Sequence, residues 1–401
     1  MKIKVALVFG GKSTEHEISI ISALQSYEWF DRNKYEVFPV YLSKENEFYF
    51  GEKLSNIENY KNLKNILKES VRVQFAKEKN RYYIKSLSSG IFSKRVLQEI
   101  DVAFLVVHGT NVEDGNLTGY FHTIGIPVSG PNVLSASLAM DKYISKKFLK
   151  EEGIPVLDAI VLNRNDVINY DEIENKIKIP AIVKAVNLGS SIGIYIAKTK
   201  EELKEKIEAA FAFSENVLIE RAVTNLKEIN CALLGDSSKQ EVSALEEPIL
   251  NSDILSFADK YLSGGGKSKG GIKSNYGKTQ NVNSKSGMAS LSRKIPAEID
   301  KKLEDEIKTL AVKIFKLLRC SGVARLDFII DMDENKAYFN EINMPPGSLA
   351  YYLFEPVGIS KSMLVDKIVD VALKNKRIEE DLNFTFESNV LSNIGSKGSK
   401  K

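Results

Sequence analysis

The sequence predicts a protein that is part α/β and part α+β, with a parallel sheet in its N-terminal part. Continuous apolar runs at 3–9 and 101–107 are typical of buried strands, and helical patterns alternate with them. From residue 141 the pattern restarts as an irregular mixture of strands and helices. The chain has 401 residues, of which 43% are hydrophobic, and is long enough for two or three domains.

The N-terminal elements follow from these patterns. After the strand at 3–9 we expect a helix that reaches about Ser26, and Thr14 and Glu17 fit a capping box at its start. The residues at 45–95 are polar and aromatic without a clear period. The further elements expected here are strands at 37–42, 101–107 and 126–130, helices at 59–69 and 116–124, and a hairpin at 71–86.

The rest of the chain predicts two further domains. We expect boundaries that give an N-terminal domain at 1–135, a central one at 136–225, a C-terminal one at 226–380 and a disordered tail at 381–401. The elements expected after residue 140 are helices at 141–152, 200–212, 298–318 and 360–375, and strands at 156–162, 180–186, 192–197, 216–221 and 227–235.

One segment, 263–290, differs sharply in composition. It is rich in Gly, Ser, Asn and Lys and contains no acidic residue. A long segment of this kind inside a domain is either an inert linker or a functional loop. The functional interpretation is a basic lid that closes over phosphates.

Composition excludes several classes of function. The net charge is +3, with Lys and Glu interspersed, so we expect no nucleic-acid partner. No apolar run is long enough for a signal peptide or a membrane span, and the two cysteines form no disulfide framework or metal motif. We therefore expect a cytoplasmic protein without a membrane partner.

Two familiar motifs are incomplete. GGKST at 10–14 resembles the end of a P-loop, but Ala6 stands where that motif needs glycine, and no GxGxxG is present. The string at 189–193 matches GxSxG, whose fold requires a histidine after the serine. All histidines precede it, which excludes a serine hydrolase.

The segments 322–330 and 338–343 predict a hairpin with a turn at 331–335. A turn centred near Asp333 would place Arg325 opposite Glu341. One face would then carry Arg325, Asp327, Ile329, Phe339, Glu341 and Asn343, and the other Leu326, Phe328, Ile330, Tyr338 and Ile342. Carboxylate and amide oxygens are the ligands that Mg²⁺ prefers. The alternative is an amphipathic hairpin with a solvated polar face.

A possible phosphate cradle lies in the middle of the chain. Lys184 lies in the predicted strand 180–186, which is followed at once by NLGSSIG at 187–193, whose glycines allow backbone N–H groups to approach an anion. The alternative for Lys184 is a surface residue on an edge strand.

These features occur in an order that resembles the D-alanine–D-alanine ligases of the ATP-grasp superfamily. The resemblance spans about residues 3–375. Its motifs are VFGGKSTEHEIS (8–19), VVHGTNVEDG (106–115), SASLAMDK (135–142), VKAVNLGSSIGI (183–194), VLIERAV (217–223), KEINCALLG (227–235), DKY (259–261), ARLDF (324–328) and NEINMPPG (340–347).

The resemblance implies the three-part ATP-grasp architecture, with ATP held between the last two domains, and a homodimer. The residues that it implies for ATP are Lys142, Lys184 and Lys260, Ser191, Glu220, Ala222 and Val223 at the adenine, and Glu228 at the ribose. It also implies that two Mg²⁺ or Mn²⁺ ions are held by Asp327, Glu341 and Asn343.

For the amino-acid substrates, the resemblance implies that Glu15 and Ser190 orient the first D-alanine, with His108 lining that pocket. It implies Tyr261 as an anchor of the lid, and Arg325 with the backbone N–H of Gly347 as the groups that stabilise the oxyanion. From the residues alone, the alternative for Glu15 is an acid at a helix start, and for His108 an imidazole with a backbone partner. Each follows the carboxyl end of a predicted strand, where α/β sheets bind ligands, and this position favours the functional interpretation.

The implied activity is the ATP-dependent joining of two D-alanines through an acyl phosphate, for peptidoglycan synthesis. Tyr352 and Leu353 stand where the family usually has serine and leucine at the second substrate, and the lid is longer and richer in glycine. These departures favour, as an alternative, a ligase with another amino acid or hydroxy acid as second substrate. A non-catalytic ATP-binding protein is a third and weaker hypothesis, because the proposed metal ligands are present.

Overall fold

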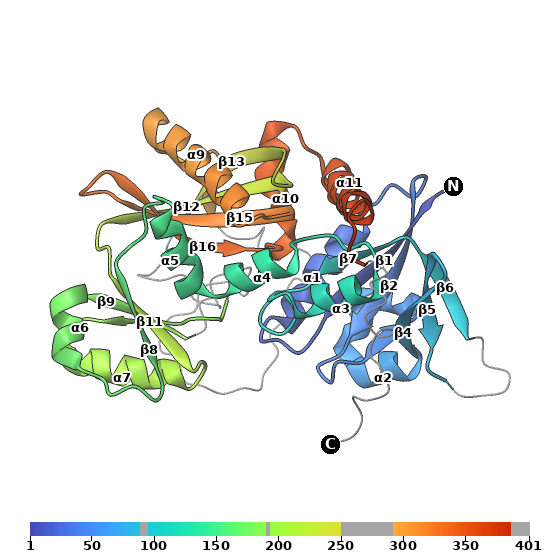
Figure 1. Cartoon of the computed structure of the whole chain (residues 1–401), viewed down its shortest axis with the longest axis horizontal. Helices are drawn as coiled ribbons and strands as arrows, with labels where there is room; N and C mark the ends of the chain where they lie inside the picture. Colours follow the sequence, from blue (N-terminus) through green and yellow to red (C-terminus); the bar gives the residue numbers. More distant parts are fainter. Residues whose placement is uncertain (89–94, 190–192, 250–291, 386–401) are drawn as a thin grey trace, which may run out of the picture.

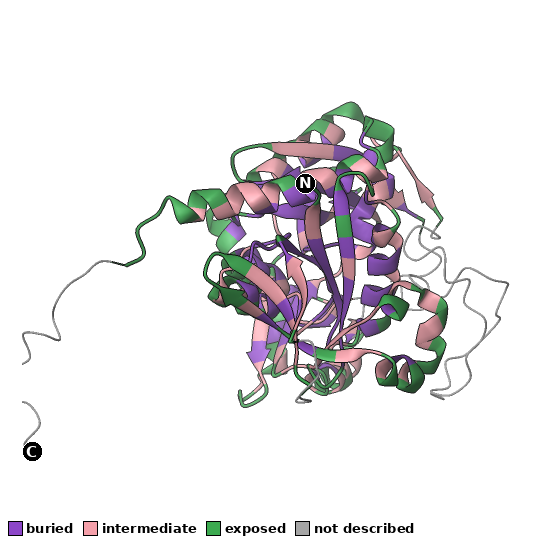
Figure 2. Cartoon of the chain, turned by 90° about the vertical axis from the view of Figure 1, so that its right-hand side faces the viewer, coloured by how far each residue is buried: buried purple, intermediate pink, exposed green. Residues whose placement is uncertain are grey.

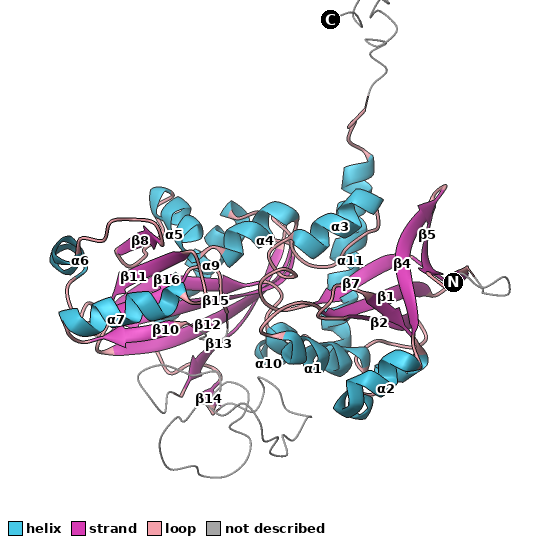
Figure 3. Ribbon diagram, turned by 90° about the horizontal axis from the view of Figure 1, so that it is seen from below, coloured by secondary structure: helices cyan, strands magenta, loops and turns pink. Residues whose placement is uncertain are grey.

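The computed structural model describes residues 1–88, 95–189, 193–249 and 292–385, and in these residues the chain forms three β-sheets with flanking helices (Figure 1). Figure 3 shows the N-terminal sheet on one side of the molecule and the other two sheets on the opposite side, with helices α1 and α10 between them. The mixed α/β and α+β class predicted from the sequence is confirmed.

The N-terminal sheet has seven strands in the order β6-β5-β4-β3-β2-β1-β7. Its strands are β1 (Ile3–Gly10), β2 (Tyr35–Leu42), β3 (Phe48–Phe50), β4 (Val71–Glu78), β5 (Arg81–Ser86), β6 (Val96–Ile100) and β7 (Val102–Val106). Only β1 with β2 and β1 with β7 pair in parallel, so the predicted parallel sheet is in fact mixed. The predicted hairpin at 71–86 is present, whereas 126–130 contributes a single bridge, from Val128 to Ala103.

The helices of this part are α1 (His16–Tyr27), α2 (Leu63–Lys68) and α3 (Asn116–Ile124), with short 3₁₀ helices η1 (Glu52–Ser55) and η2 (Ile57–Asn62). The capping box predicted at Thr14 and Glu17 is wrong. The helix begins one residue later than it requires, with Glu15 at the N-cap and no capping hydrogen bond from its side chain. The Ser13 hydroxyl instead accepts the Glu15 N–H at 3.0 Å, so a local turn precedes the helix.

The central sheet has four antiparallel strands in the order β10-β9-β11-β8. They are β8 (Ala159–Asn163), β9 (Ala181–Ala185), β10 (Ile194–Ala197) and β11 (Asn216–Arg221). The helices α6 (Tyr170–Ile177) and α7 (Lys200–Phe211) pack on one face, through buried residues such as Ile173 and Ile207. The other face is therefore available to the polar side chains of β9 and β11.

The third sheet has the order β14-β13-β12-β15-β16. Its strands are β12 (Leu226–Gly235), β13 (Gln240–Pro248), β14 (Arg293–Lys294), β15 (Gly322–Asp331) and β16 (Lys336–Asn343). The apolar stripe of α9 (Lys301–Leu317) packs on one face, where Ile307, Phe315, Phe328 and Phe339 are fully buried. Two helices, α4 (Val133–Met140) and α5 (Lys142–Glu151), contact this sheet at its β16 edge.

The register of the hairpin β15–β16 differs from the prediction. Asp327 lies opposite Glu341, and Arg325 lies opposite Asn343. The pairing shifts between Asp327 and Phe328, because Asn340 is an extra residue in β16 and forms a β-bulge. The bulge reverses the alternation of side chains, so Phe339 joins the buried core of the sheet and Tyr338 lies on the opposite face.

The C-terminal segment packs back onto the N-terminal sheet. The elements after β16 are η4 (Gly347–Ala350), α10 (Tyr351–Phe354), η5 (Glu355–Val357) and α11 (Lys361–Glu380). One apolar core joins residues of β1, such as Val5 and Leu7, with Leu353, Leu364 and Ile368. Figure 2 shows that buried residues concentrate in the strands at the centre of the molecule, whereas exposed residues lie mostly at its periphery. The predicted boundaries at 135, 225 and 380 stay predictions, and this shared core crosses two of them.

No helix in the part of the chain that the structure describes is long and apolar enough to cross a membrane.

The start of β15 generates a test of how closely the third sheet packs against the segment around Gly130. Gly322 has φ +81, and a Cβ there would lie 2.8 Å from the Cα of Gly130. Gly358 has a similar φ of +85 but nothing within 4 Å of its Cβ position. We expect Gly322→Ala to lower the free energy of unfolding by about 1–3 kcal/mol more than Gly358→Ala, because only the first adds a backbone clash. Urea denaturation measures both; equal losses would contradict the close contact.

Candidate active site

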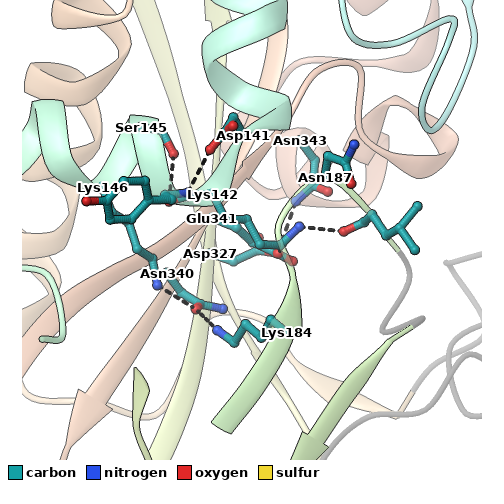
Figure 4. A network of polar contacts seen from close by, with 12 residues as sticks. Asp141, Lys142, Ser145, Lys146, Lys184, Asn187, Asp327, Asn340, Glu341 and Asn343 are labelled. Atoms are coloured by element: carbon teal, nitrogen blue, oxygen red, sulfur yellow. Dashed lines mark hydrogen bonds and ion pairs between the residues drawn. The ribbon is translucent and has the colours of Figure 1, made fainter. Parts of the chain in front are cut away.

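A buried ion cluster joins the central sheet to the third sheet. Lys146 on α5 and Lys184 on β9 both pair with the carboxylate of Glu220 on β11, the second at 2.6 Å. Only 1% of the Glu220 side chain is exposed. The amide oxygen of Asn340, the residue of the bulge, accepts from Lys184 at 2.9 Å and from Lys146 at 3.5 Å (Figure 4). The bulge therefore turns Asn340 toward the lysines.

The charges in this cluster stabilise one another. Burial opposes ionisation of Glu220, but Lys146 and Lys184 outweigh it and lower the pKa of Glu220 to about 2. Burial also lowers the pKa of Lys146 to about 8, although Glu220 opposes this shift. Removing one partner of a buried pair typically costs about 3–5 kcal/mol, because the other charge is left uncompensated. The edge-strand interpretation of Lys184 is wrong, since β9 lies between β10 and β11.

Lys142 lies at the first turn of α5, where the Asp141 side chain caps the helix by accepting from two backbone N–H groups. Its ammonium group lies 3.5 Å from the Glu341 carboxylate and donates to the backbone oxygen of Leu188. The same lysine thus touches the acidic hairpin and the segment that begins the Gly/Ser loop (Figure 4). A cation at this junction is suited to bind phosphate oxygens.

The acidic hairpin faces these lysines. Asp327 accepts two hydrogen bonds of 2.7 Å from Arg325, through Nε and a terminal nitrogen, and a third of 3.2 Å from the Asn343 amide. Burial opposes the charge on Arg325, but Asp327 outweighs it and raises the Arg325 pKa well above its usual value. The prediction that Arg325 lies opposite Glu341 is wrong. Its cross-strand neighbour is Asn343, and its ion-pair partner is Asp327 on the same strand.

These residues fit a divalent metal ion. Asp327 and Glu341 are direct cross-strand neighbours, and Asn343 is hydrogen-bonded to the first of them. The described ranges contain no group of three or more His, Cys, Asp or Glu side chains that could hold a metal by themselves. Two carboxylates and one amide are the donor set of a Mg²⁺ site that is completed by substrate phosphates and water.

Glu15 lies where the N-terminal domain meets this cluster. Glu15 is 6% exposed, and a Cβ on Gly189 would lie 2.6 Å from its carboxylate, so the start of the Gly/Ser loop covers it. A Cβ on Gly109, in the loop that follows β7, would lie 3.0 Å from the same carboxylate. The carboxylate is therefore enclosed by backbone, which suits the recognition of a small ammonium group.

Glu113 is a neighbouring carboxylate that sequence reasoning missed. It accepts the N–H of Gly109 at 2.7 Å and the N–H of Met344 at 3.0 Å, and so ties the N-terminal domain to the loop after β16. Burial, together with the nearby Glu15, raises the pKa of Glu113 to about 8. The motif at 106–115 contained this residue, but nothing in it indicated the contact with Met344.

His108 forms a hydrogen bond with a backbone oxygen, as expected if its role is to hold a loop in place. Its two ring nitrogens lie 3.1 Å from the Pro345 oxygen and 3.1 Å from the Ser22 hydroxyl. Ser22 also accepts the Ser348 N–H at 3.0 Å. Burial lowers the pKa of His108 to about 4, so the ring is neutral and joins α1 to the loop beyond the hairpin.

This loop leads to Tyr352 and Leu353, the residues that the resemblance assigned to the second substrate. After Gly347, three residues in succession, Ser348, Leu349 and Ala350, have φ near +50, which costs about 1–3 kcal/mol each. The left-handed turn is held by the bonds of Ser348 to Ser22 and Gln25 on α1. It leads into α10, where Tyr352 and Leu353 are buried.

The opposite end of the site is apolar. Val223, Leu157 and Tyr338 form a small cluster against Leu226 and Ile329. Ile329 pairs with Glu228 in the third sheet, so the predicted adenine and ribose residues adjoin one another. The Ala222 N–H donates to the Pro180 oxygen at 3.1 Å.

The remaining predicted residues are Ser190, Ser191, Lys260, Tyr261 and the segment 263–290; they lie outside the described residues, as does the tail from 386. Two members of the ion cluster, Lys146 and Asn340, were not predicted. Lys146 is four residues after Lys142 on the same helix face, a spacing that could have indicated it.

Two family models match the chain. The model of the D-ala D-ala ligase N-terminus matches residues 4–131, and that of the D-ala D-ala ligase C-terminus matches 148–285 and 278–370. A curated D-alanine–D-alanine ligase of Thermosipho melanesiensis is 34% identical over 97% of this chain and 98% of the relative.

The chain belongs to the D-alanine–D-alanine ligase family. It is thus an ATP-grasp ligase, as the order of its motifs predicted. Two solved structures of this kind are similar to it. The D-alanine–D-alanine ligase of Coxiella burnetii has 25% identity and a TM-score of 0.75, covering 94% of this chain and 96% of that one. The VanG D-Ala:D-Ser ligase of Enterococcus faecalis has 30% identity and a TM-score of 0.73, covering 93% and 100%.

Glu113 generates a prediction about the pH dependence of stability. Its folded-state pKa of about 8 lies above that of the unfolded chain, about 4.5, so the folded state holds the proton more tightly. The resulting stabilisation is complete below pH 4.5 and is lost as the pH rises to 8. Relative to the wild type, Glu113→Gln should therefore gain stability with rising pH, by at most about 1.4 kcal/mol per unit.

Urea denaturation of the ligand-free protein between pH 5 and 8.5 measures this difference. Glu152→Gln, at an exposed carboxyl, is the control. Any constant cost of the amide at position 113 cancels from the slope, so a difference that does not change with pH would contradict the assignment.

Proposed function

We propose that the protein is a D-alanine–D-alanine ligase, which joins two D-alanines at the expense of ATP to supply the dipeptide for peptidoglycan. The observation that carries this is the arrangement of one site from three parts of the chain. Lys142 and Lys184 face the carboxylates of Asp327 and Glu341, and Glu15 lies at their junction with the N-terminal domain. Cations, metal-binding oxygens and an ammonium-binding carboxylate are what this reaction requires.

In this proposal ATP lies between the central and the third sheet. Lys142 and Lys184 bind its phosphates, with Ser191 and Lys260. The adenine lies against Val223 and the backbone of Ala222, and Glu228 binds the ribose. Because both oxygens of Glu220 are taken up by lysines, its carboxylate positions those lysines, and only the backbone beside it meets the adenine.

Asp327, Glu341 and Asn343 would hold two Mg²⁺ or Mn²⁺ ions. Such ions, when bound, neutralise charge shared between the phosphate groups.

The first step is attack by the carboxylate of the first D-alanine on the γ-phosphate of ATP, which gives an acyl phosphate and ADP. Glu15 binds the ammonium group of this D-alanine, with Ser190 and His108 beside it. The Gly/Ser loop and the lid, with Tyr261, exclude water that would hydrolyse the acyl phosphate.

In the second step the amine of the other D-alanine attacks the acyl carbon and phosphate leaves. The Gly347 N–H and Arg325 stabilise the tetrahedral oxyanion, a contribution typically worth about 3–4 kcal/mol per donor. Asp327 occupies Nε and one terminal nitrogen of Arg325, so we assign the oxyanion to the other terminal nitrogen.

A second candidate is a ligase of the same mechanism with another second substrate. Two observations favour it: Tyr352 stands at the position of the usual serine, and one similar structure is named a D-Ala:D-Ser ligase. We further propose a cytoplasmic homodimer, in line with the family resemblance.

Product analysis tests the function. Incubated with ATP, Mg²⁺ and a mixture of D- and L-amino acids, the protein should give D-alanyl-D-alanine and one ADP per dipeptide, identified by mass spectrometry.

Glu341→Gln should lower turnover at least about 100-fold with little change in melting temperature, because it removes a metal ligand. Consumption of ATP with other amines but never with D-alanine would refute the proposal, and an active Glu341→Gln would refute the metal assignment.

A further inference from the structure

Two buried side chains of the N-terminal domain hold the loop that follows β16. His108 is 4% exposed and Ser22, on α1, is 1% exposed. A ring nitrogen of His108 lies 3.1 Å from the Pro345 oxygen, and the Ser22 hydroxyl lies 3.0 Å from the Ser348 nitrogen. These two contacts fall on either side of Gly347, the residue whose N–H is assigned to the oxyanion.

The direction of each hydrogen bond between these groups is fixed. The Pro345 oxygen can only accept, so Nδ1 of His108 carries the proton. In the neutral ring Nε2 must then accept, and its partner is the Ser22 hydroxyl. The oxygen of that hydroxyl in turn accepts the Ser348 N–H. One continuous hydrogen-bond chain therefore joins the two held points of the loop.

The peptide unit between the held points carries the Gly347 N–H. Its oxygen belongs to Pro346 and accepts the Leu349 N–H at 2.9 Å. This unit is trans, so its N–H points away from its carbonyl oxygen and out of the turn. The peptide units on either side are the ones that His108 and Ser22 bind. Three hydrogen bonds thus determine the direction of one N–H.

The backbone here needs such anchoring. Ser348 and Leu349 have φ of +51 and +50, a conformation that residues with a side chain rarely adopt. A strained segment of this kind persists only where the surrounding contacts over-determine it. If the bonds to Ser22 and His108 were lost, the turn could relax and the Gly347 N–H would lose its direction.

The other group assigned to the oxyanion lies near the same hydrogen-bond chain. Burial lowers the pKa of His108, and Arg325 is close enough to lower it further. Arg325 is itself fixed by two hydrogen bonds to Asp327. Donors act most strongly on an oxyanion when they are held in place before the reaction, because no reorganisation is then needed. The hairpin fixes one donor in this way, and α1 with His108 fixes the other.

We propose that Ser22 and His108 are positioning residues for the ligation step, because their hydrogen-bond chain directs the Gly347 N–H to the oxyanion of the tetrahedral intermediate. The proposal rests on the proposed function and deepens it. It gives His108 a task on the loop, which uses both ring nitrogens, and it brings in Ser22, which touches none of the reacting atoms.

A ligand that is tetrahedral at the reacting centre tests this role in the full-length enzyme with ATP and Mg²⁺. In a phosphinate analogue of D-alanyl-D-alanine, phosphorus replaces the carbonyl carbon of the new peptide bond. Its inhibition constant should rise at least tenfold in Ser22→Ala, because this ligand needs the directed N–H. The KM values for ATP and the first D-alanine, and the inhibition constant of the planar product, should stay within about twofold.

Ser26→Ala is the matched control. Ser26 lies one turn further along α1, is equally buried, and donates its hydroxyl to the Ala23 oxygen of the same helix at 2.8 Å. It should leave all four quantities unchanged. In Ser22→Ala, an equal weakening of phosphinate, substrates and product would show a purely structural role and overturn the proposal, as would an unchanged phosphinate constant. If Ser22→Ala does not fold, Ser22→Cys, which bonds only weakly, decides by the same comparison.

A double variant tests whether the two residues act on the same N–H. His108→Phe keeps a ring in place but loses both hydrogen bonds, so its phosphinate constant should also rise at least tenfold. Adding Ser22→Ala to it should raise the constant by less than about threefold, because the N–H has already lost its direction. A double loss equal to the product of the single losses would show independent roles and overturn the proposal. A wild type that makes no dipeptide from D-alanine would instead refute the proposed function.

Discussion

The buried carboxylate of Glu220 is the interaction on which the site depends. It neutralises Lys146 and Lys184, which would otherwise repel each other inside the protein. The same lysines donate to Asn340 on the third sheet, so one charge cluster fixes the distance between the two sheets. Because the ion pairs of the cluster form without a ligand, the lysines are already in place when a phosphate arrives, and little ordering remains to be done on binding.

The β-bulge at Asn340 connects this cluster to the acidic hairpin. Without the extra residue, strict alternation would place Asn340 in the apolar face beside α9, and Phe339 beside the lysines. With it, Phe339 stays in the core, while Asn340, Glu341 and Asn343 all serve the site. Further along the chain the left-handed turn at 348–350 plays a similar part, since it leads into α10, whose Tyr352 lies near enough to Arg325 for the two groups to interact electrostatically. Irregular backbone thus builds both ends of the reaction centre.

Much of this could be predicted from the sequence. The helix at 116–124 and the strand at 216–221 have the predicted bounds; glycines flank the helix at 115 and 125, and the strand is centred on the apolar residues 217–219. The hairpin register was wrong, since Tyr338 and Phe339 are both apolar and either could face the core, so the hydrophobic pattern fits a regular strand as well as a bulged one. Glu113 and Ser22 were missed because their partners are distant in sequence, and only the fold brings them together. The motif residues were found through resemblance, and their roles stay predictions.

A crystal structure with a non-hydrolysable ATP analogue and Mg²⁺ tests the central claim most directly. The account predicts that the triphosphate lies between Lys142 and Lys184 on one side and Asp327 and Glu341 on the other, with the Glu220–lysine pairs intact and the adenine against Val223. Binding of the nucleotide elsewhere, or a Glu220 carboxylate released from both lysines to hold the ligand, would contradict it.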